Sequence, residues 1–153
     1  MHFPKSVCLS INDVVSHGVP NTYVIQPGDY MNIDIVAYKE GHHGDNSAMV
    51  FFEDDEVKVH PDIHRLSQVT RESMYAAINE CKPGVRFNKI SDIITDYAES
   101  HGYFVNQEFG GHGIAHHLHM PPLVHHNKTN RVCREEMKPG MAFTIEPILM
   151  MRN

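Results

Sequence analysis

Two acidic residues lie in the segment of the chain that most favours β-strands, where apolar side chains are expected. Asp34 and Asp45 belong to the stretch GDYMNIDIVAYKEGHHGDNSAMV, residues 28–50. A third acid, Glu146, lies in the apolar run MAFTIEPIL, residues 141–149. Three acids inside strand-like runs are difficult to explain as solvated surface groups. The pattern therefore predicts a site that uses carboxylates for chemistry.

The distance between Asp34 and Asp45 depends on where the chain turns between them. A turn centred near Lys39 and Glu40 places the two acids directly opposite each other, with their Cβ atoms about 4.5 to 5.5 Å apart. A register shifted by two residues makes them diagonal neighbours instead. Carboxylates this close repel each other, so one stays protonated unless a cation lies between them. A pair of divalent metal ions, which lie about 3.5 to 4 Å apart in hydrolytic sites, removes the conflict.

The same acids also have a structural interpretation. Asp34 could pair with a nearby lysine such as Lys39, and Asp45 could be a turn residue in HHGDNS. The comparable setting of Glu146 favours the metal site. His112 in FGGHGIAHHLH is a further candidate ligand, because the glycines on both sides let the backbone approach closely. Carboxylates with one or two imidazoles favour Mn, Fe, Co or Zn.

The composition indicates a globular protein without a strongly basic surface. The 153 residues are 41% apolar and 21% charged, with a net charge of −6 and no run of lysine and arginine. Direct contact with nucleic acid or an anionic membrane is therefore not expected. The three cysteines, Cys8, Cys81 and Cys133, are too few and too far apart for a disulfide framework, which favours the reducing cytoplasm. No signal peptide or membrane span is predicted, because no apolar stretch is long enough.

Two strand regions with two helices between them are expected to position these residues. The chain is predicted to form strands in residues 6–12 and 28–52, a helix over 62–82, a second helix between Asn88 and Gly102, and strands between 103 and 149. Asn88 is the expected N-cap of the second helix, and Gly102 is its expected end. The three acids and His112 all fall in the strand regions.

The two strand regions resemble each other. In QPGDYMNIDI and in KPGMAFTIEP an acid lies seven residues after the proline of a Pro-Gly pair, and a His-x-x-Pro motif precedes each, at His17 and His119. The shared order indicates an internal duplication with a period near 112 residues. The first unit lacks the helices that open the second, and the second lacks a strand like the one with Asp45. Residues 1–153 are therefore expected to be a single, partial domain, whose missing elements belong to a longer protein or come from another chain.

With these residues assembled, the sequence closely resembles the type I methionine aminopeptidases, which are metal-dependent enzymes of the pita-bread fold. The stretches that carry the resemblance are PKSVCLSINDVVSHGVPN (4–21), the acidic strand segment (28–50), GGHGI (110–114) and MKPGMAFTIEPIL (137–149). The resemblance implies an α+β fold with an antiparallel sheet, helices on one face and an internal pseudo-two-fold repeat. This chain would hold that fold incompletely, with pieces missing at both ends.

Matching the motifs also implies a set of site residues. The implied metal ligands are Asp34, Asp45, His112 and Glu146. A fifth ligand of the family, a glutamate on the last strand of the full domain, has no position here. The implied catalytic residues are His17, His119 and Glu146, and the two histidines would contact the substrate together with Cys8 and Leu118, which resemble walls of the methionine pocket. Leu118 stands where the family commonly has an aromatic residue, which leaves the shape of this pocket open.

The activity implied by the resemblance is removal of the N-terminal methionine from nascent proteins with a small second residue. A hydroxide that bridges two divalent metal ions, of Co, Mn, Fe or Zn, would attack the peptide bond. The implied partners are nascent peptide N-termini, with the ribosome as a candidate place of encounter. A monomer is expected, with an exchanged dimer as the alternative. The rival interpretation is a catalytically inactive fragment or binding module with weak or single metal binding.

Overall fold

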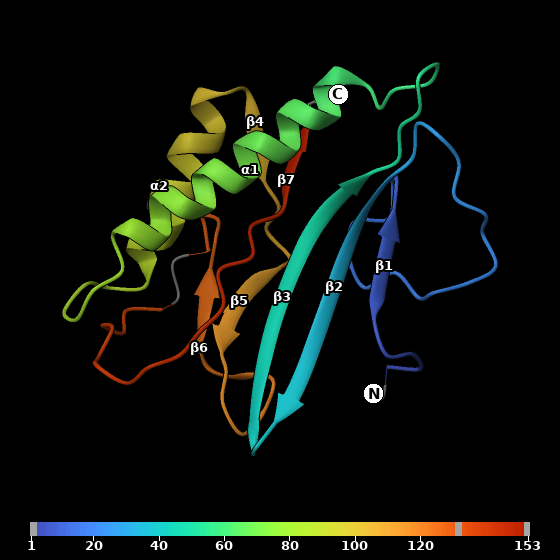
Figure 1. The fold of residues 1–153 in the computed structure, drawn as a ribbon. Coiled ribbons are helices and arrows are strands. Elements are labelled where there is room, and N and C mark those ends of the chain that lie inside the picture. The colour runs from blue at the N-terminus through green and yellow to red at the C-terminus, as the bar shows by residue number, and fades with distance from the viewer. Residues whose placement is uncertain (1–2, 131–132, 152–153) are drawn as a thin grey trace.

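The computed structural model describes residues 3–130 and 133–151 and contains three small antiparallel sheets and two helices (Figure 1). Its elements in chain order are β1 (Cys8–Ile11), β2 (Tyr30–Lys39), β3 (His42–Phe51), α1 (Pro61–Asn79), α2 (Asn88–Ser100), β4 (Tyr103–Val105), β5 (Gly110–Gly113), β6 (Met120–His125) and β7 (Leu149–Met151). The sheets have the orders β1-β2-β3, β4-β7 and β5-β6. The predicted order of strands, two helices and strands is confirmed.

The hairpin of β2 and β3 has a different register from the one predicted by a turn at Lys39 and Glu40. Asp34 lies opposite Ser47 and not opposite Asp45, so the two acids are diagonal neighbours. The turn consists of Glu40 and Gly41, whose φ angles are +52° and +84°. Two successive residues with positive φ are typical of the type I′ turn, whose twist matches that of paired strands. Because Gly41 adopts this conformation without steric cost, the turn lies one residue further along the chain than predicted.

The two helices form where the apolar periodicity predicts them, although their ends differ in detail. Helix α1 ends at Asn79, three residues before the predicted end. Helix α2 begins at Asn88 as its first residue, and its N-cap position is Phe87, so the N-cap role of Asn88 is wrong. Phe87 is 1% exposed and packs edge-on against Phe143, so core packing decides where α2 begins. Gly102 follows α2 with a φ of +84°, as predicted for a helix end.

The core lies between the helices and the strands of the second half of the chain. Its buried members are Val69, Ala77, Phe87, Ile90, Ile94, Ala98, Val105, Val124, Met137 and Leu149. Figure 1 shows both helices beside β4 to β7, and among the described residues no helix lies over β1, β2 and β3. On β2, Ile35 is 50% exposed and Tyr38 is 65% exposed. Neither helix is long and apolar enough to cross a membrane, among the residues that the structure describes.

The two Pro-Gly pairs of the predicted duplication have the same backbone conformation. Gly28 and Gly140 have φ angles of +95° and +87°. In each case the residue after the glycine donates its N–H to the carbonyl of the residue before the proline, at 3.1 and 3.2 Å. This arrangement is a type II turn, which needs a positive φ at its third position. The local match supports an internal duplication, since both turns lead into the segments that carry Asp34 and Glu146.

Asp29 fastens the long loop between β1 and β2, which carries His17. Its Oδ1 accepts a hydrogen bond from Asn12 Nδ2 at 2.8 Å, and its Oδ2 accepts from the Gln26 N–H at 2.8 Å and from the Tyr23 hydroxyl at 3.0 Å. These donors, the Asn12 amide first among them, lower the pKa of the Asp29 carboxyl. The ionised carboxylate therefore contributes to the stability of the fold.

We expect Asp29→Asn to lower the thermal unfolding temperature at neutral pH, because an amide presents one acceptor where the carboxylate presents two. A lowered pKa means that this contribution is present above the pKa of the unfolded state, about 3.9, and is lost as the pH falls through the folded value. The difference between the two proteins should therefore shrink as the pH falls below the unfolded value of about 3.9, measured by thermal denaturation in a pH series. The exposed Asp55→Asn serves as control, and equal stability of the Asp29 variant at neutral pH would contradict the assignment.

Candidate metal centre

Three of the predicted ligands converge from different parts of the fold. The Nε2 atom of His112, on β5, lies 3.6 Å from Asp45 Oδ2, on β3, and 3.5 Å from Glu146 Oε1. The ligand atoms of all three residues lie within 4.8 Å of one another. Ligand atoms that each lie about 2.0 to 2.2 Å from a shared ion are separated from one another by distances like those observed between these three residues. The arrangement therefore fits a divalent metal ion without rearrangement of the backbone.

The carboxylates of the site are crowded. Burial raises the pKa of Asp34, and the neighbouring charge of Asp45 raises it further. Burial is also the main cause that raises the pKa of Glu146, to which the charges of Asp45 and Asp34 add, while Thr144 and His112 oppose the shift. Protons or cations must therefore balance these groups. The oxygen-rich donor set with one imidazole suits Mn, Fe, Co or Zn.

His112 is held in the tautomer that a metal ligand needs. Its Nδ1–H donates to the Gly113 carbonyl at 3.1 Å, which leaves Nε2 directed at the two acids. A hydrogen bond from the second ring nitrogen to a carbonyl is the usual way in which proteins orient metal-binding histidines. The ligand role of His112 itself remains a prediction, but its orientation agrees with that role.

The glycines beside His112 allow three segments of backbone to meet. A Cβ atom on Gly111 would lie 2.2 Å from the Thr144 carbonyl oxygen, and one on Gly113 would lie 2.2 Å from the Pro121 carbonyl oxygen. The Thr144 N–H donates to the His112 carbonyl at 2.8 Å, so the segment before β7 runs along β5. The predicted close approach of the backbone is confirmed. This approach brings Glu146 within reach of His112.

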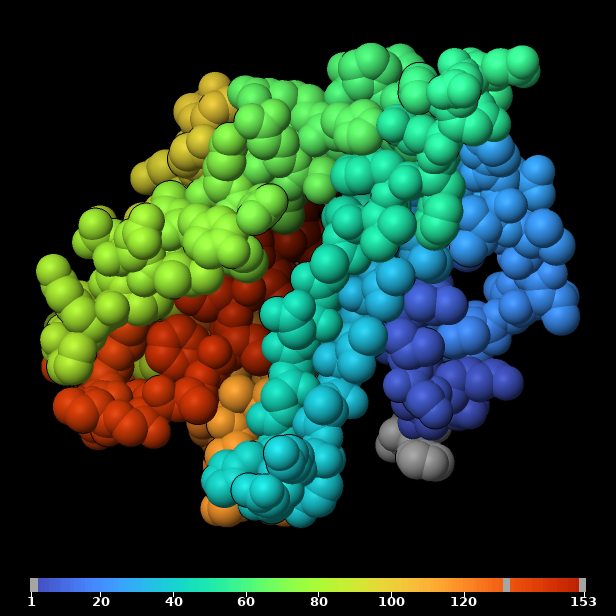
Figure 2. All heavy atoms as spheres, in the orientation of Figure 1, coloured from blue at the N-terminus to red at the C-terminus, as the bar shows by residue number. Residues whose placement is uncertain are grey.

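Glu146 lies in an extended segment and not inside a strand, so that part of the prediction is wrong. The residues around it are outside β7, and only Phe143 forms an isolated bridge, with Gly113. Pro147 follows Glu146 and has no N–H with which to continue a strand ladder. The side chain of Glu146 is 42% exposed, which leaves one edge of the site open to solvent. Figure 2 shows the segment before β7, in red, between α1 and β3.

Two residues that the sequence did not indicate hold Glu146 in place. The Thr144 hydroxyl donates to Glu146 Oε1 at 2.6 Å and accepts from the His112 N–H at 3.0 Å. The buried ring of His126 accepts the Glu146 N–H at its Nε2, at 3.3 Å. Burial lowers the pKa of His126 to about 3, so the ring is neutral and can accept. The spacing of Thr144, two residues before the acid on an extended chain, is a sequence signal for the first contact, but His126 offers none.

The structure brings both predicted catalytic histidines to the predicted metal ligands. The ring of His119 packs edge-on against His112, with centroids 4.4 Å apart. Burial lowers the pKa of His119, and the neighbouring His112 lowers it further. His17 has a φ of +54° and lies near enough to Asp34 and His119 to influence the pKa of each. A positive φ in a residue other than glycine is uncommon and occurs frequently at functional sites.

The two predicted pocket residues lie beside the same groups. Cys8 pairs directly with Asp34 across β1 and β2. Burial raises the pKa of its thiol, and the charges of Asp34 and Asp45 raise it further, so the thiol stays protonated and behaves as a small apolar group. Leu118 is half-buried next to His119. The pocket roles of Cys8 and Leu118 remain predictions.

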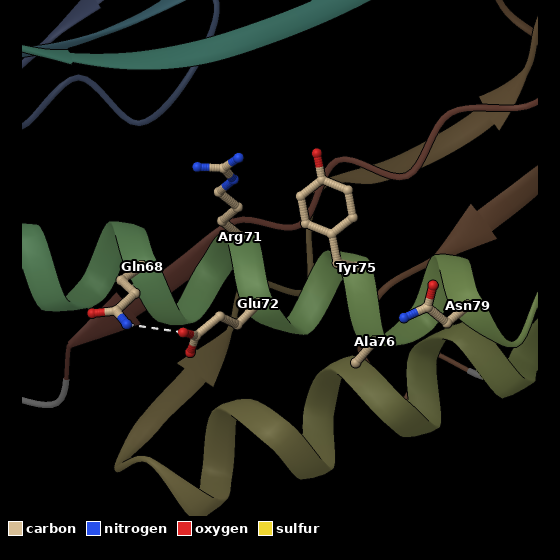
Figure 3. Close-up of a pocket in the computed structure, with 6 residues that line it drawn as sticks. All are labelled: Gln68, Arg71, Glu72, Tyr75, Ala76 and Asn79. Atoms are coloured by element: carbon tan, nitrogen blue, oxygen red, sulfur yellow. Dashed lines mark hydrogen bonds between the residues drawn. The ribbon is translucent and has the colours of Figure 1, made fainter.

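A separate surface hollow lies along α1 (Figure 3). It is lined by Gln68, Arg71, Glu72, Tyr75, Ala76 and Asn79. All six residues belong to one helix, and they include none of the residues around His112. The carboxylate cluster, and not this hollow, is therefore the candidate functional site.

The fold and its carboxylate–imidazole cluster belong to the pita-bread class of metal-dependent peptidases. The model of metallopeptidase family M24 matches residues 1–153, and the chain belongs to this family. Members of the family use divalent metal ions.

Methionine aminopeptidases are among the proteins that the chain resembles. The sequence is 44% identical over 154 residues to the methionine aminopeptidase of Buchnera aphidicola subsp. Acyrthosiphon pisum, covering 99% of this chain and 56% of that protein. It is 40% identical over 151 residues to that of Escherichia coli K12, covering 96% and 54%. The crystal structure of the Rickettsia prowazekii enzyme superimposes with a TM-score of 0.91 at 38% identity, covering 99% of this chain and 59% of that one. The chain thus spans about half the length of the curated relatives that it matches.

We expect Gly111→Ala to disrupt the candidate metal centre. The added methyl group would overlap the Thr144 carbonyl oxygen and push the Glu146 segment away from His112, at a cost of about 1 to 3 kcal/mol in the free energy of unfolding. Denaturant titration and Mn²⁺ titration measure the two effects. The matched control is Gly44→Ala, where an added Cβ meets no atom within 4 Å. An effect of Gly111→Ala no larger than that of the control would show that the close approach is not needed.

Proposed function

We propose that the site removes N-terminal methionine from nascent proteins with a small second residue, as a metal-dependent aminopeptidase. The observation that carries this proposal is the convergence of Asp45, His112 and Glu146, whose ligand atoms lie within 4.8 Å of one another. These residues occupy the motif positions that resemble the metal ligands of type I methionine aminopeptidases. The similarity to methionine aminopeptidases over almost the whole chain adds support.

We propose two divalent metal ions as the cofactor, from the group Co, Mn, Fe and Zn. Asp34, Asp45, His112 and Glu146 would be the ligands that this chain supplies. When bound, such ions activate water as a nucleophile and polarise the scissile carbonyl group. They also neutralise the carboxylates, since burial first and neighbouring carboxylate charge second raise the pKa of Asp34 and Glu146.

The chain's own residues have separate tasks in this proposal. Glu146 accepts and returns a proton at a carboxylate oxygen, while Thr144 fixes the orientation of that carboxylate. His119 stabilises the negative charge that develops on the carbonyl oxygen, and His17 contacts the substrate near the leaving amide nitrogen. Cys8 and Leu118 line the space for the methionine side chain.

We propose that the protein acts in the cytoplasm on nascent chains, as a monomer. The described cysteines Cys8, Cys81 and Cys133 are all free, in agreement with a reducing compartment. The second candidate function, a fragment that binds metal weakly or at one site, is favoured by a different observation. Ile35, whose side chain points to the face of β2 opposite that of Asp34, is 50% exposed, so a layer that covers this face of the sheet would stabilise the site.

We expect the chain to bind two equivalents of Mn²⁺ or Co²⁺ and to release methionine from a Met-Ala-Ser peptide in their presence. Asp45→Ala should abolish turnover and weaken metal binding by more than about 100-fold, since even substitutions outside the ligand shell cost about 10- to 100-fold. Calorimetric titration and peptide turnover measure the two effects. Asp55→Ala, an exposed acid in the loop after β3, is the control.

The outcomes separate the two candidate functions. Two tight sites that both depend on Asp45 support the aminopeptidase, whereas a single weak site without turnover supports the fragment. Unchanged turnover in Asp45→Ala would exclude the proposed metal centre as the source of the activity.

A further inference from the structure

Two exposed histidines face each other at the tip of the β2–β3 hairpin, outside the candidate metal centre. His42 begins β3, and His116 lies in the loop that joins β5 to β6. Their ring centroids are 4.7 Å apart, and the ring planes are inclined by 43°. Figure 1 shows the hairpin tip beside this loop. The two residues lie 74 positions apart in the sequence and meet only through the fold.

The hydrogen bonds of the two rings determine which nitrogen carries the proton. His116 Nδ1 lies 2.8 Å from the Gly41 carbonyl oxygen, and His42 Nδ1 lies 3.1 Å from the Glu40 carbonyl oxygen. A carbonyl oxygen only accepts, so each Nδ1 is the protonated atom. In the neutral rings each Nε2 therefore keeps a lone pair. Neither Nε2 has a hydrogen-bond partner within residues 3–130 and 133–151.

The backbone keeps the loop in contact with the hairpin tip. The Ala115 carbonyl accepts from the His43 N–H at 2.8 Å and from His43 Nδ1 at 3.1 Å. Together with the bond from His116 to Gly41, these contacts join the loop to both sides of the turn. The spacing of the His42 and His116 rings is therefore set before any ligand binds. Such preorganisation reduces the ordering cost of binding.

We propose that His42 and His116 form a second metal site, which takes a borderline divalent transition ion such as Zn²⁺, Ni²⁺ or Cu²⁺ through the two Nε2 atoms. Imidazole nitrogen is a preferred ligand of these ions. When two imidazoles bind one ion at about 2.0 to 2.1 Å, their ring centres lie about 4.5 Å apart at a ligand angle of 90° and about 5.2 Å apart at the tetrahedral angle. The observed spacing of 4.7 Å lies within this range. The carbonyl bonds at Nδ1 are the second-shell contacts that orient metal-binding histidines.

An ion at this site would join the two halves of the candidate metal centre. His42 belongs to the hairpin that carries Asp34 and Asp45, and His116 belongs to the loop between His112 and His119. Binding would therefore hold the hairpin against the loop and stabilise the folded state. The oxygen-rich centre favours an ion such as Mn²⁺, whereas the nitrogen pair favours Ni²⁺, so the two sites differ in selectivity.

The test is calorimetric titration with Ni²⁺ in the Asp45→Asn background, which weakens the proposed centre and keeps the hairpin. We expect one Ni²⁺ site, which His42→Asn and His116→Asn each weaken by at least about tenfold. Asparagine retains a side-chain N–H that can donate to the same carbonyl but lacks Nε2. Because one ion needs both rings, the double variant should lose no more than either single variant.

His101→Asn is the matched control. Its Nδ1 also lies on a carbonyl, that of Tyr97 at 2.8 Å, but its ring stacks on Tyr97 and not on a second imidazole. We expect unchanged Ni²⁺ affinity in the His101→Asn variant. In a second measurement, Ni²⁺ should raise the thermal unfolding temperature of the Asp45→Asn background protein but not that of the His42 or His116 variants. Unchanged affinity in either single variant, or losses that add in the double variant, would overturn the shared site.

Discussion

The crowding of carboxylates around His112 is the constraint on which the rest of the structure depends. Asp34 and Asp45 come from one hairpin and Glu146 from a segment near the other end of the chain, and the pKa values of Asp34 and Glu146 are raised. Mutual repulsion of the acids favours separation of these elements. Two features of the fold oppose this separation. The glycines beside His112 allow close backbone contacts along β5, and the core holds the helices against the second strand unit.

The consequence is a site assembled between two units that are stabilised unequally. The second unit has a helix-covered core, and within it Thr144 and His126 hold Glu146 through hydrogen bonds. Within the part of the chain that the structure describes, no helix covers the β1-β2-β3 sheet, so its strands depend on their own ladder and on edge contacts. The bonds between His43 and Ala115 and between His116 and Gly41 are such contacts. They act at the end of the hairpin, where they limit movement of Asp34 and Asp45.

The sequence predicts the element types well because their signals are local. Helical periodicity, the Pro-Gly turns and acids in strand-forming runs all need only neighbouring residues, and the structure has the helices, both turns and the carboxylate hairpin. The errors concern choices made by tertiary contacts. Burial of Phe87 decides where α2 begins, and Gly41 moves the hairpin turn by one residue, which changes the pairing of Asp34 by two. Glu146 leaves the strand pattern because Pro147 cannot continue a ladder.

The histidines show most clearly what the sequence leaves open. An imidazole has two nitrogens, and its role follows from what the fold provides for each. The buried ring of His126 is neutral, and its Nε2 accepts the N–H of Glu146, so it holds the backbone of Glu146 in place. His112 and His116 instead donate Nδ1–H to carbonyls, and Nε2 remains as the donor atom for a cation. Histidines thus acquire different roles, as a hydrogen-bond acceptor or as a ligand of a cation, because long-range contacts select the tautomer before any ligand binds.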